Sequence, residues 1–312
     1  MAILKGGGMV VIVIYLFFGS AVAQAFHPIS GWPDSVNNRI ENFLNNTKVI
    51  TERKVAVFDC DGTLFGQSPY YLADEAIYAY AKRHYEGKSD SRSINKMKII
   101  NNMLHGSNTG MAYVKERIDF LSGMTTEEVQ RMGEDCFKQK YRNKFYPQMR
   151  ELLADLKAYG FEIWVLSASP ELLYQGFVHE ETGIPVDRIL GVKSVIRNDT
   201  VTNTLVFPVP QDGGKAEALQ TFIKAQPLFA GGNSRGDMEM MNQSVGLKLI
   251  VNPDSQQVEK GSEAGEMEGK TVYGYWSDHR AVMVHCKDVP EGKINYITGQ
   301  WGIKRNKSNP DK

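Results

Sequence analysis

The spacing of apolar positions changes near Pro147, and this change divides the chain into two kinds of segment. Between about residues 68 and 145, apolar residues recur at helical spacing, and no run is typical of a strand. The helices predicted there are 73–85, 94–104, 111–121 and 126–140. Thr125 and Glu128 have the spacing of a capping box, which predicts where the last of these helices begins.

After Pro147, short β-rich runs alternate with helical segments. The predicted strands are 161–166, 189–196, 201–206, 228–230 and 247–251, and the predicted helices are 149–159, 171–179, 216–224 and 237–242. A helix at 34–46 and a buried strand at 54–58 precede the helical segment. Residues 189–206 predict a hairpin. Strands separated by crossover helices imply a parallel sheet with helices on both faces. We therefore predict a Rossmann-like, doubly wound α/β core (26–67 and 146–312) with an all-helical insert (68–145).

The first 25 residues have the order of a secretory signal. Lys5 is the only charge before an apolar run at 9–18, and small residues at 20–25 offer two A-x-A cleavage sites. An uncleaved anchor is the alternative, but the run is short for a membrane span of about 20 residues. We expect an exported protein, periplasmic or secreted.

Composition excludes some classes of partner and site. Lys+Arg and Asp+Glu both number 36 in 312 residues, so the net charge is zero. A neutral chain gives no general electrostatic case for nucleic acid or an anionic membrane surface, and we expect neither as a partner. The three cysteines are scattered, and no Cys/His spacing suggests zinc.

Three polar clusters follow predicted strands that are far apart in the sequence. Asp59 and Asp61 follow the strand 54–58, Ser167 follows 161–166, and Asn233 with Asp237 follows 228–230. In an open parallel sheet, ligands bind beyond the carboxyl ends of the strands. We expect these clusters to meet at one edge of the sheet.

The order of these clusters resembles that of the haloacid dehalogenase-like hydrolases. Residues 59–65, DCDGTLF, match the first motif of that superfamily, D-x-D-G-T-[LV]-[FY]. Ser167 matches the second motif, Lys215 the third, and residues 231–237, GGNSRGD, resemble the fourth. Ser169 and Lys193 are the alternatives for the second and third motifs. The resemblance covers roughly residues 52–252 and implies a magnesium-dependent hydrolase.

The chemistry of these side chains agrees with that resemblance. A carboxylate such as Asp59 can attack a phosphorus ester and form an aspartyl-phosphate. Asp61 can protonate the leaving oxygen and then activate water. The resemblance implies that Ser167 donates a hydrogen bond to the phosphoryl group. It also implies that Lys215 neutralises charge on Asp59 and the phosphate.

The resemblance implies a Mg²⁺ site made of the Asp59 carboxylate, the Asp61 backbone carbonyl and a side chain of the fourth motif. Asn233 stands where the family usually has Asp. Either Asn233 is a neutral ligand and Asp237 acts through water, or Asp237 binds the metal itself. We favour the first arrangement, because an amide oxygen is still a hard ligand that suits Mg²⁺.

The helical insert has the position and length of the helical cap of this superfamily, which implies that it selects the substrate. Its tyrosines could hold a quaternary ammonium by cation–π contact, as in phosphocholine, although packing the helices is the simpler role for them. The insert and the glycine-rich fourth motif also resemble phosphoserine phosphatases. We expect a small phosphomonoester as substrate. A phosphotransferase would share every residue named above, and a non-catalytic binding protein should have lost Asp59 or Asp61.

Overall fold

The computed structural model of the protein describes residues 25–106, 110–258, 267–288 and 294–301. The signal sequence expected in residues 1–25 lies outside these ranges apart from its last residue. Within the described ranges, no helix has both the length and the apolar character needed to cross a membrane.

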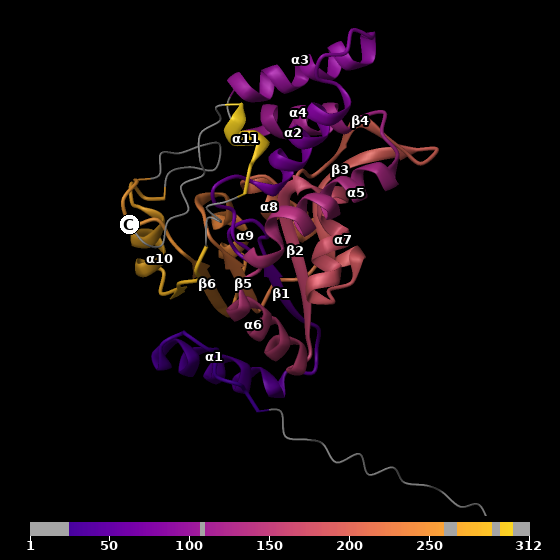
Figure 1. Ribbon diagram of the computed structural model, residues 1–312. Helices are drawn as coiled ribbons and strands as arrows, with labels where there is room; N and C mark the ends of the chain where they lie inside the picture. Colours follow the sequence, from indigo (N-terminus) through magenta and orange to yellow (C-terminus); the bar gives the residue numbers. More distant parts are fainter. Residues whose placement is uncertain (1–24, 107–109, 259–266, 289–293, 302–312) are drawn as a thin grey trace, which may run out of the picture.

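A seven-stranded sheet forms the centre of the molecule, in the order β4-β3-β2-β1-β5-β6-β7 (Figure 1). Neighbouring strands are parallel except for the antiparallel pair β3–β4. The strands are β1 Lys54–Phe58, β2 Phe161–Pro170, β3 Ile189–Arg197, β4 Thr200–Val206, β5 Phe229–Gly232, β6 Leu247–Val251 and β7 Val282–Val284. This topology confirms the predicted parallel sheet and its hairpin.

The alternation of side chains along β1 shows why helices cover both faces of the sheet. Ala56 and Phe58 point into one apolar cluster, which includes residues of α1 (Asp34–Asn46), α6 (Pro147–Ala158) and α7 (Glu171–Thr182). Val55 and Val57 point into a second cluster, with residues of α8 (Gly213–Ala218), α9 (Met238–Asn242) and α10 (Val272–Asp278). A strand that is apolar on both faces has to be buried on both faces. The doubly wound core is therefore confirmed.

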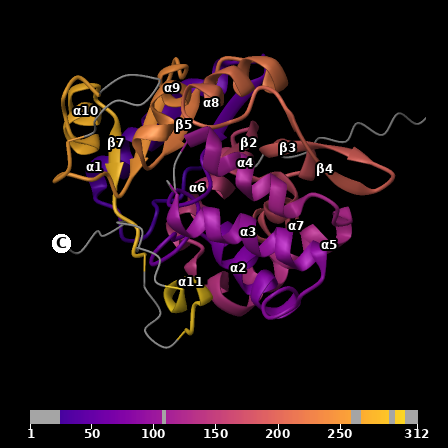
Figure 2. The same ribbon diagram turned by 90° about the horizontal axis from the view of Figure 1, so that it is seen from above.

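The insert between β1 and β2 is helical. It contains α2 Leu72–His84, α3 Ser91–His105, α4 Gly110–Leu121 and α5 Thr126–Cys136, which lie together in Figure 2. The predicted capping box is present, because the Thr125 hydroxyl accepts from the Glu128 amide and the Glu128 carboxylate accepts from the Thr125 amide. No strand occurs in the described part of 72–144. The division of the chain into domains at 68 and 145 stays a prediction.

Two parts of the fold differ from the predicted elements. β2 runs through Ser167 to Pro170 instead of ending at residue 166, because its pairing with β3 resumes at Pro170 after a register shift. The polar serines interrupt the apolar pattern there, although the backbone stays extended. The C-terminal elements α10, β7 and α11 (Ile297–Gln300) were not predicted, because they are short. Cys60, Cys136 and Cys286 are buried and form no disulfide.

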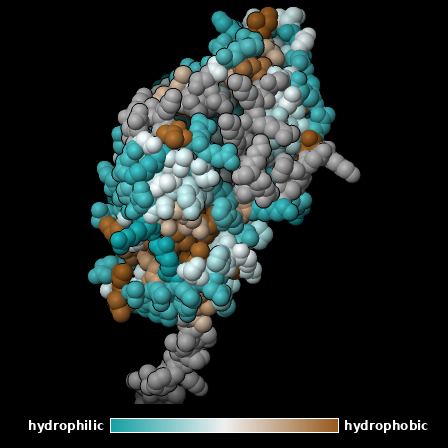
Figure 3. Space-filling view, turned by 90° about the vertical axis from the view of Figure 1, so that its left-hand side faces the viewer, coloured by the Kyte–Doolittle hydropathy of each residue, from teal (hydrophilic) through white to brown (hydrophobic). Residues whose placement is uncertain are grey.

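The C-terminal segment passes from the core to the helical insert. Asp288, four residues after β7, bonds to the Ser68 amide and to the Lys144 ammonium, one on each linker of the insert. Further on, α11 lies beside the insert in Figure 1, and Tyr296 and Trp301 contact aromatic rings of the insert and its linkers. The face shown in Figure 3 is mostly hydrophilic, and its hydrophobic residues form small, separate groups.

Candidate active site

The carboxyl ends of three neighbouring strands bring the predicted site residues together. β1 lies between β2 and β5, and all three are parallel. Asp59 follows the last residue of β1, and its amide donates to the Gly231 carbonyl of β5 at 3.0 Å. Asn233 follows the last residue of β5, and Ser167 lies three residues before the end of β2. The predicted convergence at one edge of the sheet is therefore present.

Lys215 joins two carboxylates at this edge. Its Nζ lies 2.5 Å from Asp59 Oδ1 and 2.6 Å from Asp237 Oδ1. All three side chains are buried. Lys215 lies in the first turn of α8, which places its long side chain over the end of β1. Lys193, the alternative, pairs with Glu171 instead.

The charges of this cluster shift the pKa values of its members. Burial, followed by repulsion from Asp237, raises the pKa of Asp59, and Lys215 only partly offsets these effects. Burial lowers the pKa of Lys215, but attraction to Asp237 and Asp59 outweighs it and raises the pKa above its usual value. The cluster therefore holds more negative charge than one ammonium group neutralises.

Asp237 is surrounded by donors. Its Oδ2 accepts from the amides of Asn233 and Ser234 at 2.9 and 3.0 Å and from the Ser234 hydroxyl at 3.2 Å. Its Oδ1 accepts from Lys215. Gly232 permits this close approach, since a Cβ there would lie 2.6 Å from the Asp237 Cβ. Asp237 thus holds the loop after β5 and orients the lysine.

Oxygen atoms gather around Thr63, on the turn after β1. The Thr63 hydroxyl donates to Asp59 Oδ2 at 2.9 Å and lies 3.5 Å from Asn233 Oδ1. Gly62 has a φ of +80°, and a Cβ there would lie 2.1 Å from the side-chain nitrogen Nδ2 of Asn233, so the turn lies directly against that side chain. Among the described residues, no group of three or more His, Cys, Asp or Glu side chains is arranged to hold a metal.

These oxygens nevertheless fit the ligand set that the sequence predicts. That set contains one carboxylate side chain, one side-chain amide oxygen and one backbone carbonyl, so it does not require three acidic, histidine or cysteine side chains. Hard oxygen donors and an excess of buried negative charge suit Mg²⁺. The assignment of each ligand stays a prediction.

Asp61 accepts a hydrogen bond on each of its carboxylate oxygens. Tyr174 donates to Oδ1 at 2.8 Å, and Ser169 donates to Oδ2 at 2.9 Å. Burial raises the pKa of Asp61, and the hydrogen bonds from Tyr174 and Ser169 oppose that rise. Asp61 is therefore held in a fixed orientation beside Asp59.

A cavity of about 410 Å³ connects these groups. Asp59, Asp61, Lys215 and Asn233 line it from the core, and Tyr71, Tyr113 and Arg117 line it from the side of the insert. Arg117 is buried and pairs with Asp74 at 2.8 Å, while its guanidinium lies 4.4 Å from the centre of the Tyr113 ring and 5.9 Å from that of Tyr71. Burial lowers the pKa of Arg117, but attraction to Asp74, the hydrogen bond to Asp74 and the nearby Tyr113 and Tyr174 hydroxyls together raise it above its usual value.

The two serines of the second motif differ in their surroundings. Both are buried, but Ser169 lines the cavity with Ala168, whereas Ser167 does not, and the Ser167 Oγ accepts from the Ser169 amide at 3.1 Å. The Ser169 hydroxyl donates to the Asp61 carboxylate, which is a different contact from the one predicted for the second motif. The role of Ser167 toward a phosphoryl group stays a prediction.

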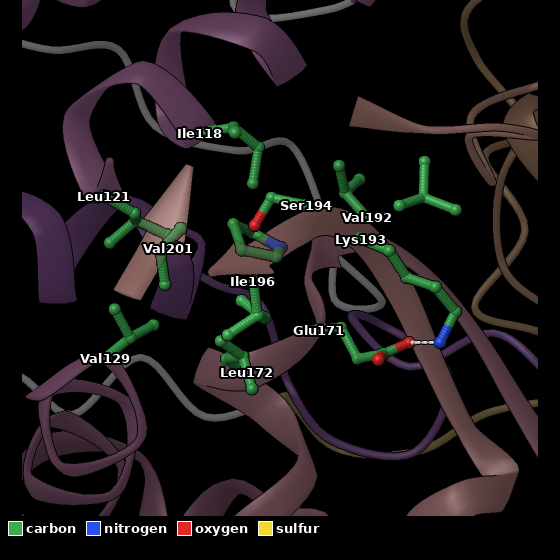
Figure 4. A pocket seen from close by; sticks show the side chains of 12 residues that line it. Ile118, Leu121, Val129, Glu171, Leu172, Val192, Lys193, Ser194, Ile196 and Val201 are labelled. Atoms are coloured by element: carbon green, nitrogen blue, oxygen red, sulfur yellow. Dashed lines mark hydrogen bonds and ion pairs between the residues drawn. The ribbon is translucent and has the colours of Figure 1, made fainter. Parts of the chain in front are cut away.

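A second cavity, of about 130 Å³, lies between α4, α5, the β3–β4 hairpin and the start of α7 (Figure 4). Its walls are mostly apolar, with Ile118, Leu121 and Val129 from the insert. The Lys193–Glu171 pair lies at its side in Figure 4. Of the described residues that line it, only Lys193 and Glu171 are charged, and they pair with each other, whereas Lys215 and several carboxylates converge at the first cavity, so the first is the candidate active site.

Two side chains at this site were not predicted from the sequence: Arg117, which lines the cavity, and Tyr174, which donates to Asp61 from behind it. Tyr174 lies in the first turn of α7, directly after β2, a position that could have indicated it. Arg117 follows Tyr113 and Val114 on the buried face of α4, so a charged residue at an apolar position was its only signal. Neither residue belongs to a recognisable motif.

Comparison with known proteins identifies the family of this chain. The model of the haloacid dehalogenase-like hydrolase family matches residues 56–242. A protein of Mycobacterium leprae (strain TN) described as a hydrolase is 23% identical over 221 residues, which are 64% of this chain and 67% of that protein.

Two solved structures share the fold. A protein of unknown function from Bordetella pertussis Tohama I has a TM-score of 0.57 at 14% identity, covering 75% of this chain and 99% of that one. A functionally unknown protein from Anaerococcus prevotii DSM 20548 has a TM-score of 0.54 at 14% identity, covering 72% and 87%. The family model matches more than half of the length of this chain. Because the residues that match the motifs of that family also lie together at one sheet edge, the chain belongs to the haloacid dehalogenase-like hydrolases.

Proposed function

We propose that the protein is an exported, magnesium-dependent phosphomonoester hydrolase that acts through a phosphorylated Asp59. One observation carries the proposal: Lys215 binds Asp59 at 2.5 Å, and Asp61 lines the same cavity. A nucleophilic carboxylate, a second acid and a fixed cation are the groups that phosphoester hydrolysis needs.

The reaction has two steps. In the first, an Asp59 oxygen bonds to phosphorus while the bond to the ester oxygen breaks, and Asp61 gives its proton to that leaving oxygen. In the second, water attacks phosphorus, Asp61 takes a proton from it, and the Asp59–phosphorus bond breaks. Lys215 offsets negative charge on Asp59 and the phosphoryl oxygens throughout, and Ser167 is proposed to donate to the phosphoryl group.

The Asp59 carboxylate, the Asp61 carbonyl and the Asn233 amide oxygen would hold Mg²⁺. When bound, Mg²⁺ supplies charge neutralisation and polarises a phosphoryl oxygen. Asp237 already accepts from Lys215 and from three donors of its own loop, which favours a supporting role for it rather than a direct one.

The helical insert is proposed to act as a cap that selects the substrate. Arg117 already occupies the faces of Tyr113 and Tyr71, so a quaternary ammonium would have to displace a guanidinium that Asp74 holds. The cavity therefore favours a substrate whose remainder is polar or anionic, such as phosphoserine, over phosphocholine. A higher kcat/KM for phosphocholine than for phosphoserine would contradict this preference.

Phosphate release by residues 26–312 with Mg²⁺ tests the proposed function. We expect turnover of phosphomonoesters by the wild type and by Asp187→Asn, an exposed control. Asp59→Asn should lose turnover and should no longer be trapped by beryllium fluoride. Activity of Asp59→Asn close to that of the wild type would refute the mechanism. Transfer of phosphate to added alcohols in preference to water would identify a phosphotransferase, and absence of both activities a binding protein.

Export is proposed from residues 1–25 alone. Sequencing the amino terminus of the protein recovered from its producing cells should show cleavage after Ala23 or Ala25. An intact Met1 in the exported fraction would indicate an uncleaved anchor.

A further inference from the structure

The carboxylate of Asp61 is held on both of its oxygens by hydroxyl groups from the core. Tyr174 of α7 donates to Oδ1 at 2.8 Å, and Ser169 of β2 donates to Oδ2 at 2.9 Å. The Tyr174 and Ser169 residues are 1% and 3% exposed, so water competes little for these bonds. With both oxygens bound, the plane of the carboxylate is fixed.

The position of the Tyr174 hydroxyl is set by aromatic packing. The Tyr174 ring lies 5.1 Å from that of Phe177 and 6.2 Å from that of Phe65. Phe65 belongs to the turn that carries Asp61, and its carbonyl accepts from the Gly62 amide at 2.8 Å. The ring of Tyr174 therefore packs against the same turn whose carboxylate its hydroxyl binds.

We propose that Tyr174 is a positioning residue for Asp61, and that its hydroxyl keeps the carboxyl group aligned for proton transfer to the leaving oxygen. This inference rests on the proposed function, in which Asp61 is the acid and then the base. A hydroxyl can donate to a carboxylate and accept from a carboxylic acid, so it can stay bound to Asp61 in both protonation states. Ser169 alone would leave the group free to rotate about its Cβ–Cγ bond.

The leaving-group dependence of the reaction separates positioning from packing. A poor leaving group, such as the alkoxide of phosphoserine, needs its proton in the transition state, whereas the phenolate of p-nitrophenyl phosphate does not. General acid catalysis contributes about 10²–10⁴-fold, so we expect Tyr174→Phe to lower kcat/KM for phosphoserine by roughly tenfold or more. For p-nitrophenyl phosphate kcat/KM should change little. The comparison uses kcat/KM because hydrolysis of the phosphorylated Asp59 is common to both substrates and affects only kcat.

Tyr141→Phe is the matched control. Tyr141 is also buried, its ring lies 6.5 Å from that of Phe65, and its hydroxyl donates to the Tyr70 carbonyl at 2.8 Å. Both substitutions remove one buried hydroxyl from the same aromatic cluster. Only Tyr174→Phe should change the ratio of the two kcat/KM values. An equal loss of kcat/KM on both substrates, or a ratio equal to that of Tyr141→Phe, would overturn the inference.

Asp61→Asn, measured beside these variants, tests the proposed function separately. If Asp61→Asn lowers kcat/KM equally for both substrates, the role of Asp61 as an acid fails. A crystal structure of Tyr174→Phe then still decides the inference without any activity. We expect the Asp61 carboxylate to turn away from its present plane, and an unchanged orientation would show that Tyr174 does not position it.

Discussion

Replacing Asp288 by Asn tests whether the C-terminal segment fixes the helical insert to the core. The Asp288 and Lys144 side chains are 0% and 1% exposed and lie 2.9 Å apart. Asp288 also accepts from the Ser68 amide at 2.8 Å, 220 positions earlier in the chain. A Cβ at Gly66 would lie 2.1 Å from Asp288 Oδ1, so the first linker lies directly against this carboxylate.

Asp288→Asn is expected to lower the free energy of unfolding considerably, because it removes the charge of only one partner of the buried ion pair. Asn keeps the shape of the side chain but removes the negative charge, so the Lys144 ammonium stays buried without this counter-charge. Removing one partner of a buried ion pair typically costs about 3–5 kcal/mol. The whole free energy of unfolding of a domain is only about 5–15 kcal/mol. Urea denaturation should therefore show a clearly lowered midpoint for Asp288→Asn.

A double-mutant cycle with Lys144→Met isolates the pair itself. In the double variant neither position carries a buried charge that has lost this partner. The double variant should therefore be more stable than the sum of the two single losses predicts. The exposed Arg131–Glu127 pair is the reference, because its side chains are 72% and 66% exposed and its coupling should be below about 0.5 kcal/mol. If Asp288→Asn costs less than about 1 kcal/mol, well below the range for buried pairs, other contacts hold the linkers.

Three further predictions concern the insert and the metal site. Glu75→Gln should free the C-terminal segment for limited proteolysis, because the buried Glu75 carboxylate accepts three hydrogen bonds from the start of α11; an unchanged cleavage rate would contradict this. Asn233→Ala should weaken Mg²⁺ binding in calorimetry more than Asp237→Asn does, and the reverse order would make Asp237 the direct ligand. Gly62→Ala should lower activity far more than Gly87→Ala, since both have positive φ but only the first Cβ meets a neighbour; equal effects would implicate backbone strain alone.

The sequence was sufficient to predict the elements that depend on local pattern. The strand β1 has the predicted bounds because five apolar or half-buried residues are followed by a polar turn with glycine. Asp59, Ser167 and Asn233 could be placed at one edge because parallel strands end on the same side of a sheet. The helical spacing of apolar residues predicted the helices of the insert, and the spacing of Thr125 and Glu128 predicted the capping box of α5.

Other contacts of the site had no local signal. Tyr174 is separated by 113 positions from Asp61, and Arg117 by 43 positions from Asp74. Such pairs depend on how helices pack on the finished sheet, which hydrophobic periodicity does not specify. The extension of β2 was not predicted because Ser167 and Ser169 are polar and break the apolar pattern of the strand.

The contacts that hold the helical insert against the core also affect the shape of the cavity. The cavity has one wall from the core, with Asp59 and Asp61, and another from α4, with Arg117. The distance between these walls depends on the two linkers, which Asp288 holds together. It also depends on α2, whose Glu75 binds α11. The C-terminal segment carries none of the four motifs, yet its contacts help to place the α4 wall of the cavity. Under the proposed cap function, loosening this segment should change substrate preference before it changes the bond-breaking step.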